Sequence, residues 1–281
     1  MQNGTVWELP FDQPAVLELQ TEFGNLSLVP VEQGQAPRLE LSRGAENVDV
    51  HVDKQGEVVR VSLEPLQPFN WFGGWDCRAT LYVPRDLRAA LQTSAGSVSV
   101  RNLEGCELGI KANAGKIDLV DIYGLMHLAA DAGSITGRGL GGYFDVEAHA
   151  GSVRLEILDL QPGEHRIRAS MGSVRIELGR GMDVCIETHT SLGSARTSYP
   201  VRADAPARLV LSTDMGSVRV DEASQPAVRR PTSDVSDGAR RDDASKAPRE
   251  DPELERILKM VEAGELSARD ADELLRAMGR V

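Results

Sequence analysis

A short phrase centred on one glycine recurs along much of this chain. It reads SAGSVSV at 94–100, HAGSVRL at 149–155, SMGSVRI at 170–176 and DMGSVRV at 214–220. Seven copies align on the glycine, at successive spacings of 19, 18, 18, 21, 21 and 23 residues. These glycines are Gly96, Gly115, Gly133, Gly151, Gly172, Gly193 and Gly216. A unit of this length cannot bury an apolar face alone, so the repeat predicts units that stack on one another.

The columns on either side of the glycine indicate β-strands. Apolar residues stand two and four positions after most of the glycines, with a polar residue between them, which is typical of a half-buried strand. The first of these columns holds Val98, Ile117, Ile135, Val153, Val174, Ala195 and Val218. The glycine itself predicts a positive φ or a corner without room for a Cβ. We therefore expect an all-β fold, a single-stranded β-solenoid whose rungs hold 18–23 residues.

The repeat divides the chain into four predicted parts. Residues 79–222 form the solenoid, and residues 1–78 form an N-terminal strand and capping region. Within that region, TEFGNLSLVP at 21–30 is a fainter copy of the repeat, and the alternating stretch at 46–65 predicts a hairpin around KQGE. Residues 223–250 hold Pro, Ser, Asp and Arg with few large apolar residues, so they predict a flexible linker.

The last part, residues 251–279, predicts a hairpin of two helices. Apolar residues follow the helical spacing i, i+3, i+4, i+7 in the first helix, and Gly264 stands where that helix ends. The predicted docking residues are Leu254, Ile257, Leu258, Val261, Leu274 and Leu275. Two short helices bury little surface, so this hairpin is expected to dock on a partner, on a second copy of itself or on the solenoid.

Composition narrows the class of protein. The formal net charge is −12, which disfavours a nucleic-acid partner because phosphate backbones are repelled. No apolar run approaches the length of about 18 residues that spans a bilayer. The three cysteines form no CxxC pair, and the N-terminus lacks the pattern of a secretory signal. We expect a soluble, reduced, cytoplasmic protein with buried thiols and without a metal or another cofactor.

Four arginines are the first candidate binding residues. They occupy the position three residues after the glycine in the later rungs, and acidic residues flank them. They are Arg154, Arg175, Arg196 and Arg219. The row is either a basic stripe for an anionic ligand or a solvated face whose charges neutralise one another, each pair contributing about 0–1 kcal/mol.

Other polar residues do not form a catalytic or metal pattern. An enzyme of the carbohydrate-active β-helix type needs carboxylates stacked on adjacent rungs, and the arginine column replaces them. His149 and Asp131 share a column on adjacent rungs, but the sequence shows no third ligand for a metal.

An aromatic stretch, PFNWFGGWD at 68–76, is the second candidate. Phe69, Trp71, Phe72 and Trp75 gather there in a chain that is only 4% aromatic. The stretch is either a contact for lipid, glycan or protein, or a plug over the first rung.

Two segments resemble known bacterial families. LYVPRDLRAALQTSAGSVSVRNLEG at 81–105 resembles the putative-adhesin β-solenoid family of the YvlB/LiaX type. ERILKMVEAGELSARDADELLRAM at 255–278 is similar to the SHOCT-like helical hairpin, an oligomerisation module of envelope-stress proteins.

The resemblance implies a non-enzymatic interaction scaffold linked to the response to cell-envelope stress. Its hairpin would mediate self-association or the docking of a protein partner, and the partner could be associated with the inner membrane. The expected location is therefore the cytoplasm or the periphery of the inner membrane. A carbohydrate-active β-helix enzyme and a surface adhesin are the alternatives.

Overall fold

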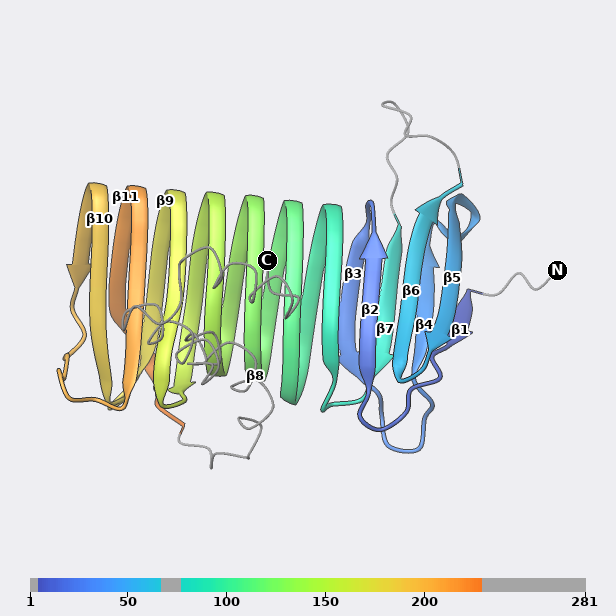
Figure 1. The fold of residues 1–281 in the computed structure, drawn as a ribbon, viewed down its shortest axis with the longest axis horizontal. Helices are drawn as coiled ribbons and strands as arrows, with labels where there is room; N and C mark the ends of the chain where they lie inside the picture. Colours follow the sequence, from blue (N-terminus) through green and yellow to red (C-terminus); the bar gives the residue numbers. More distant parts are fainter. Residues whose placement is uncertain (1–4, 67–76, 229–281) are drawn as a thin grey trace, which may run out of the picture. The chain divides into compact units, whose positions relative to one another are not determined.

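The computed structural model describes residues 5–66 and 77–228 (Figure 1). The chain divides into two units, Met1–Pro231 and Thr232–Val281, and every described residue belongs to the first. The predicted helical hairpin and the aromatic stretch with Phe69, Trp71, Phe72 and Trp75 lie outside the described residues.

The described residues are almost entirely β-strand. The N-terminal strands are β1 (Val6–Glu8), β2 (Val16–Thr21), β3 (Asn25–Pro30), β4 (Arg38–Arg43), β5 (Val48–Gln55), β6 (Val58–Pro65) and β7 (Arg78–Val83), with one short 3₁₀ helix, η1 (Ala45–Asn47). The remaining strands are β8 (Arg88–Leu160), β9 (Gly163–Arg180), β10 (Val184–Thr197) and β11 (Ala207–Pro226).

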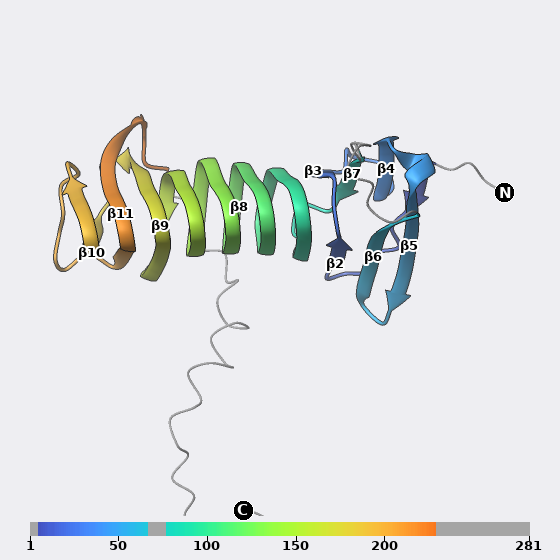
Figure 2. The same cartoon turned by 90° about the horizontal axis from the view of Figure 1, so that it is seen from above.

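These strands wind as coils that stack side by side, which confirms the predicted β-solenoid (Figures 1 and 2). β8 alone runs for 73 residues because its backbone stays extended through the corners of successive coils. Each coil has one strand before its corner glycine and one strand after it. The strands before the glycine join β2, β6 and β5 in one face, which we call the β2 face. The strands after the glycine join β3, β7, β4 and β1 in the other, the β3 face.

The coils do not stack in the order of the sequence. At the N-terminal end, the coil of β2 and β3 lies between the first coil of β8 and the coil formed by β6 and β7. At the other end, β11 lies between β9 and β10, although β10 precedes it in the chain. Repeats placed next to each other along the sequence therefore are not always neighbours in the stack.

Side-chain polarity accounts for the order at the C-terminal end. Leu211 of β11 is buried and pairs in register with Thr188 of β10, while Val220 pairs with Thr197. β11 thus offers apolar side chains at inward positions where β10 offers threonines. Among the described strands, β10 pairs only with β11. It forms the last coil of the stack, where polar side chains at inward positions are exposed to solvent at little cost in free energy.

The ends of the solenoid differ from the predicted boundaries. The solenoid begins at β2, because β2–β3 and β6–β7 form complete coils and not only a cap. β11 continues through Pro226, so residues 223–226 belong to a strand and not to the predicted linker. The predicted hairpin around KQGE is confirmed as the antiparallel pair of β5 and β6.

The glycine column forms the corner between the two faces. Gly96, the first of the seven repeats, has a φ of 124°, and the others have φ values between 144° and 155°. A Cβ built on Gly151 would stand 1.6 Å from the carbonyl oxygen of Gly133, the corner of the preceding coil. Both predicted reasons for glycine therefore hold at this corner, the positive φ and the lack of space.

The interior is a continuous file of aliphatic side chains. Val98, Ile117, Ile135, Val153 and Val174 are each at most 1% exposed. Ala195 is exposed, because it lies on the terminal coil β10. The predicted shared core is thus confirmed along the stack up to its last coil.

One histidine interrupts this apolar interior. His165 is fully buried, and its Nε2 lies 2.7 Å from the carbonyl oxygen of Gln161. The backbone N–H of Phe144 donates to His165 Nδ1 at 3.2 Å, so the ring is a neutral acceptor at that nitrogen. Burial lowers the pKa of His165 below its ordinary value, and the hydrogen bond to Gln161 opposes this only in part.

The glycine corner predicts a graded response to alanine. Gly151→Ala should lower the free energy of unfolding by about 3 kcal/mol or more, since strain at positive φ adds to overpacking. The matched control is Gly105→Ala, where φ is 70° but a Cβ would meet nothing within 4 Å. In this control the free energy of unfolding should fall by only about 1–2 kcal/mol. Urea unfolding measures both, and equal losses would show that the close approach at the corner does not matter.

The buried histidine predicts loss of stability in acid. The unfolded state binds a proton near pH 6.5 whereas folded His165 does not, so stability falls as pH drops below 6.5, by up to about 1.4 kcal/mol per pH unit. His165→Leu should be less stable at pH 8, because the Phe144 N–H loses its acceptor, yet show a weaker dependence on pH. Urea unfolding at pH 8 and pH 5 tests this, with exposed His149→Gln as the control. An unchanged pH dependence in His165→Leu would contradict the assignment.

Candidate functional site

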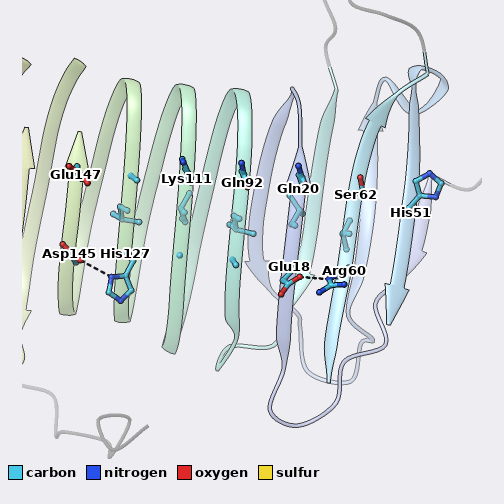
Figure 3. Close-up of a pocket in the computed structure, with 18 of the residues that line it drawn as sticks. Glu18, Gln20, His51, Arg60, Ser62, Gln92, Lys111, His127, Asp145 and Glu147 are labelled. Atoms are coloured by element: carbon cyan, nitrogen blue, oxygen red, sulfur yellow. Dashed lines mark hydrogen bonds and ion pairs between the residues drawn. The ribbon is translucent and has the colours of Figure 1, made fainter. Parts of the chain in front are cut away.

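An open groove with a volume of about 690 Å³ crosses the β2 face (Figure 3). It runs over β5, β6, β2 and the four coils of β8, so it lies across the strands and along the stack. Residues of the same phase on neighbouring coils line it, because the coils pair in parallel and in register. Glu18 of β2, for example, lies between Arg60 of β6 and Ala90 of β8. The groove therefore depends on register, since residues distant in sequence form each wall.

Two rows of outward side chains border the groove. Figure 3 shows one row with Glu147, Lys111, Gln92, Gln20 and Ser62. The second row in the figure contains Asp145, His127, Glu18 and Arg60. Between His127 and Glu18 the second row is interrupted by two small residues, Ala90 and Gly109, which also line the groove. Two short side chains thus stand in this row where the neighbouring coils carry long ones.

Polar contacts hold the long side chains on both sides of this interruption. Arg60 Nε lies 2.6 Å from Glu18 Oε2, and His127 Nδ1 lies 3.5 Å from Asp145 Oδ2. Each pair is solvent-exposed and contributes about 0–1 kcal/mol to stability.

The groove carries a modest excess of negative charge. Four carboxylates line it, from Glu18, Asp53, Asp145 and Glu147, against the two cations Arg60 and Lys111. An anionic chain laid along the groove would therefore meet net repulsion. Sequence analysis missed this site, and the only available signal was the run of small residues at outward positions of successive rungs.

The four predicted arginines lie in one row on the β3 face. Arg175 pairs in register with Arg154 on one side and with Arg219 on the other, and Arg219 pairs with Arg196. Arg219 thus precedes Arg196 in the row, because β11 is inserted before β10. The structure brings all four predicted residues together on adjacent coils.

Only one of these arginines has a close acidic partner in the described part of the chain. Arg219 Nε lies 2.5 Å from Asp221 Oδ2, and this hydrogen bond holds the pKa of Asp221 below its usual value. Arg154 and Arg196 make no hydrogen bond or ion pair with another described residue. The flanking acidic row, which includes Glu156 and Glu177, therefore neutralises the arginines only in part.

An acid–base cluster occupies the same face on earlier coils. Thr136 Oγ1 donates to Asp118 Oδ1 at 2.7 Å, and Lys116 Nζ lies 3.3 Å from the same oxygen. Partial burial acts to raise the pKa of Asp118, but Thr136 and Lys116 outweigh it, so the pKa lies below its ordinary value. This carboxylate is satisfied by its neighbours and is not poised as a general acid.

The histidine column and the cysteines form no further site. His149 Nδ1 lies 3.3 Å from Asp131 Oδ1, so these two residues do face each other. Across residues 5–66 and 77–228, no three or more His, Cys, Asp or Glu side chains are placed to hold a metal ion. Cys77 and Cys106 are buried thiols, and burial raises the pKa of Cys106 to about 12. Cys185 is partly exposed, which differs from the prediction of buried thiols throughout.

Comparison with known families bears on the C-terminal segment. Residues 252–280 match the SHOCT-like domain family. The predicted docking residues, from Leu254 to Leu275, lie within this match and outside the described residues. No curated protein matches the chain. In the described part of the chain, no helix combines the length and the apolar character needed to cross a membrane.

Three solved structures of bacterial proteins align with most of this chain. A putative cell adhesion protein from Clostridium sporogenes is 9% identical, with a TM-score of 0.35 over 78% of this chain and 98% of that one. A putative adhesin from Bacteroides fragilis is 10% identical, with a TM-score of 0.38 over 76% and 94%. A putative adhesin from Parabacteroides merdae is 11% identical, with a TM-score of 0.30 over 78% and 94%.

Proposed function

We propose that this chain is a non-enzymatic interaction scaffold of the bacterial response to cell-envelope stress. The solenoid presents binding faces, and the hairpin at 251–279 mediates oligomerisation or docks a partner. The observation that carries the proposal is the SHOCT-like match at 252–280 on a chain whose repeats form a solenoid. The link to envelope stress comes from the resemblance of these two parts to the YvlB/LiaX type.

The solenoid suits a scaffold because its surface is regular. Each coil inside the stack is hydrogen-bonded to a coil on either side, so outward side chains repeat at the strand spacing of about 4.8 Å. A rigid row of this kind favours an extended or multivalent partner. Binding costs little conformational entropy on the side of the solenoid, because its side chains are already ordered on a rigid backbone.

The arginine row is the face that we assign to an anionic partner. Like charges placed directly opposite each other on adjacent strands destabilise a sheet. Four arginines in register, with one close acidic partner among the described residues, therefore leave positive charge that an anionic group can neutralise. Self-association through the hairpin would strengthen such contacts by multivalency.

The proposed location is the cytoplasm or the inner face of the inner membrane. A protein partner at that membrane would bring the scaffold there. Recovery of the protein in the cytoplasmic or inner-membrane fraction would agree with this location, whereas recovery from the cell surface would favour an adhesin.

Removal of the hairpin tests the scaffold proposal. A chain ending at residue 250 should form particles with fewer protomers by light scattering than the full chain, or should lose a partner in a pull-down. The matched control is the full chain with Lys259→Gln, a change outside the predicted docking residues. If truncation alters neither the number of protomers per particle nor the captured proteins, the hairpin does not mediate association.

Substitution of the arginine row tests the anionic contact. Replacing Arg154, Arg175, Arg219 and Arg196 together with Gln should weaken binding to polygalacturonate by about tenfold or more, and salt should weaken wild-type binding. Arg60→Gln, on the β2 face, is the control and should bind like the wild type. Binding that is insensitive to both salt and the four substitutions would leave the row as a solvated face.

A further inference from the structure

Gly109 differs from the other described glycines. Each of those has a positive φ or a site where a Cβ would clash with a neighbour. Gly109 has neither, and a Cβ there would meet only the carbonyl oxygen of Ala89, at the ordinary contact distance of 3.8 Å. Glycine inside a strand lowers stability, by roughly 0.5–1 kcal/mol relative to alanine. The fold therefore does not account for glycine here, and such a residue often marks the close approach of a ligand.

Gly109 lies in the groove of the β2 face, where the second row of side chains is interrupted. Ala90 and Gly109 occupy two successive coils between Glu18 and His127. Three strand spacings separate Glu18 from His127, on the order of 14 Å. The interruption is thus a shallow apolar depression, with the Glu18–Arg60 ion pair at one end and the His127–Asp145 contact at the other.

Hydrogen-bonding groups without partners stand beside the depression. Gln92 and Lys111 belong to the same two coils as Ala90 and Gly109. Their side chains lie in the first row, beside the depression (Figure 3). Neither side chain makes a hydrogen bond or an ion pair with another described residue. Glu18 adds a carboxylate acceptor at one end of the depression. A ligand here would find an apolar floor with donors and acceptors at its rim, the usual composition of a small-molecule site.

We propose that this groove binds a neutral glycan chain, with one sugar ring seated over Ala90 and Gly109. The C–H face of a sugar ring would contact the apolar floor, and its hydroxyls would bond to Gln92, Lys111 and Glu18. The excess of carboxylates in the groove disfavours an anionic chain. The groove extends over seven strands, from β5 to the fourth coil of β8, which suits an extended chain better than a single sugar.

A peptide strand fits this groove less well. Peptides add to sheets through unpaired backbone groups at an edge. The strands under Ala90 and Gly109 are interior strands of the β2 face, with neighbours on both sides. The site is separate from the arginine row, and the inference does not rest on the function proposed above.

Calorimetric titration with neutral hexasaccharides tests the inference on the full-length protein. The probes are maltohexaose, cellohexaose and chitohexaose. We expect at least one neutral probe to bind the wild type. Gly109→Val fills the depression and should weaken that binding by about tenfold or more. The urea concentration at the unfolding midpoint of the Gly109→Val variant should equal or exceed that of the wild type, because valine favours β-strands.

Further variants separate the groove from the rest of the molecule. Lys111→Ala and Gln92→Ala should also weaken binding without any change to the backbone of the floor. Ser173→Val, on the β3 face, is the matched control and should bind like the wild type. The quadruple arginine variant should likewise bind the neutral probe normally.

Three results would overturn the inference. The first is that the wild type binds no neutral probe. The second is that Gly109→Val binds the neutral probe as tightly as the wild type does. The third is that binding of the neutral probe is lost only in the quadruple arginine variant. None of these results depends on the oligomeric state. A failed glycan site is therefore distinguishable from a failed scaffold function, which the truncation at residue 250 reports.

Discussion

The whole solenoid depends on the close approach of one coil to the next at the glycine corner. At Gly172 a Cβ would stand 1.6 Å from the carbonyl oxygen of Gly151, so no other residue fits there without displacing the backbone. This approach lets the chain turn sharply and pair in parallel with its neighbour along both faces. Because every coil turns at the same residue, the register of one coil sets the register of the next.

In-register stacking converts a repeat along the sequence into rows in space. The same geometry yields opposite chemistry on the two faces. On the β3 face it lines up four arginines, and on the β2 face it lines up acids, amides and small residues around a groove. Both proposed binding surfaces are therefore consequences of one backbone constraint, and neither requires a specialised loop.

The two ends of the stack show how the chain manages exposed edges. β11 lies inside the stack and buries its apolar side chains there. β10 is the last coil and carries threonines at positions that face the interior. At the other end, the antiparallel strands β4 and β5 cover the coil of β6 and β7. A last coil with apolar side chains at its inward positions would expose an apolar interior to solvent. The departure from sequence order at the C-terminal end thus places the coil with polar inward side chains at the exposed end of the stack.

The sequence by itself determined the coil. The glycine column predicted the corner, the alternation on each side predicted the two strands, and the shared phase of Arg154 and Arg175 predicted their adjacency. These features are local, because a period of about 20 residues places each residue over its counterpart in the next rung. The pair of His149 and Asp131 was readable for the same reason.

Only the tertiary structure decided which coils are neighbours and where the groove lies. The periodicity is the same whether β11 follows β10 or precedes it in the stack. The order of these two coils depends instead on the polarity of their inward side chains. Glu18 and Arg60 meet because β2 and β6 pair across more than 40 residues of sequence, outside the regular repeat. Small residues such as Ala90 and Gly109 recur at the period of the rungs, but the part of the groove over β5, β6 and β2 leaves no periodic signal in the chain.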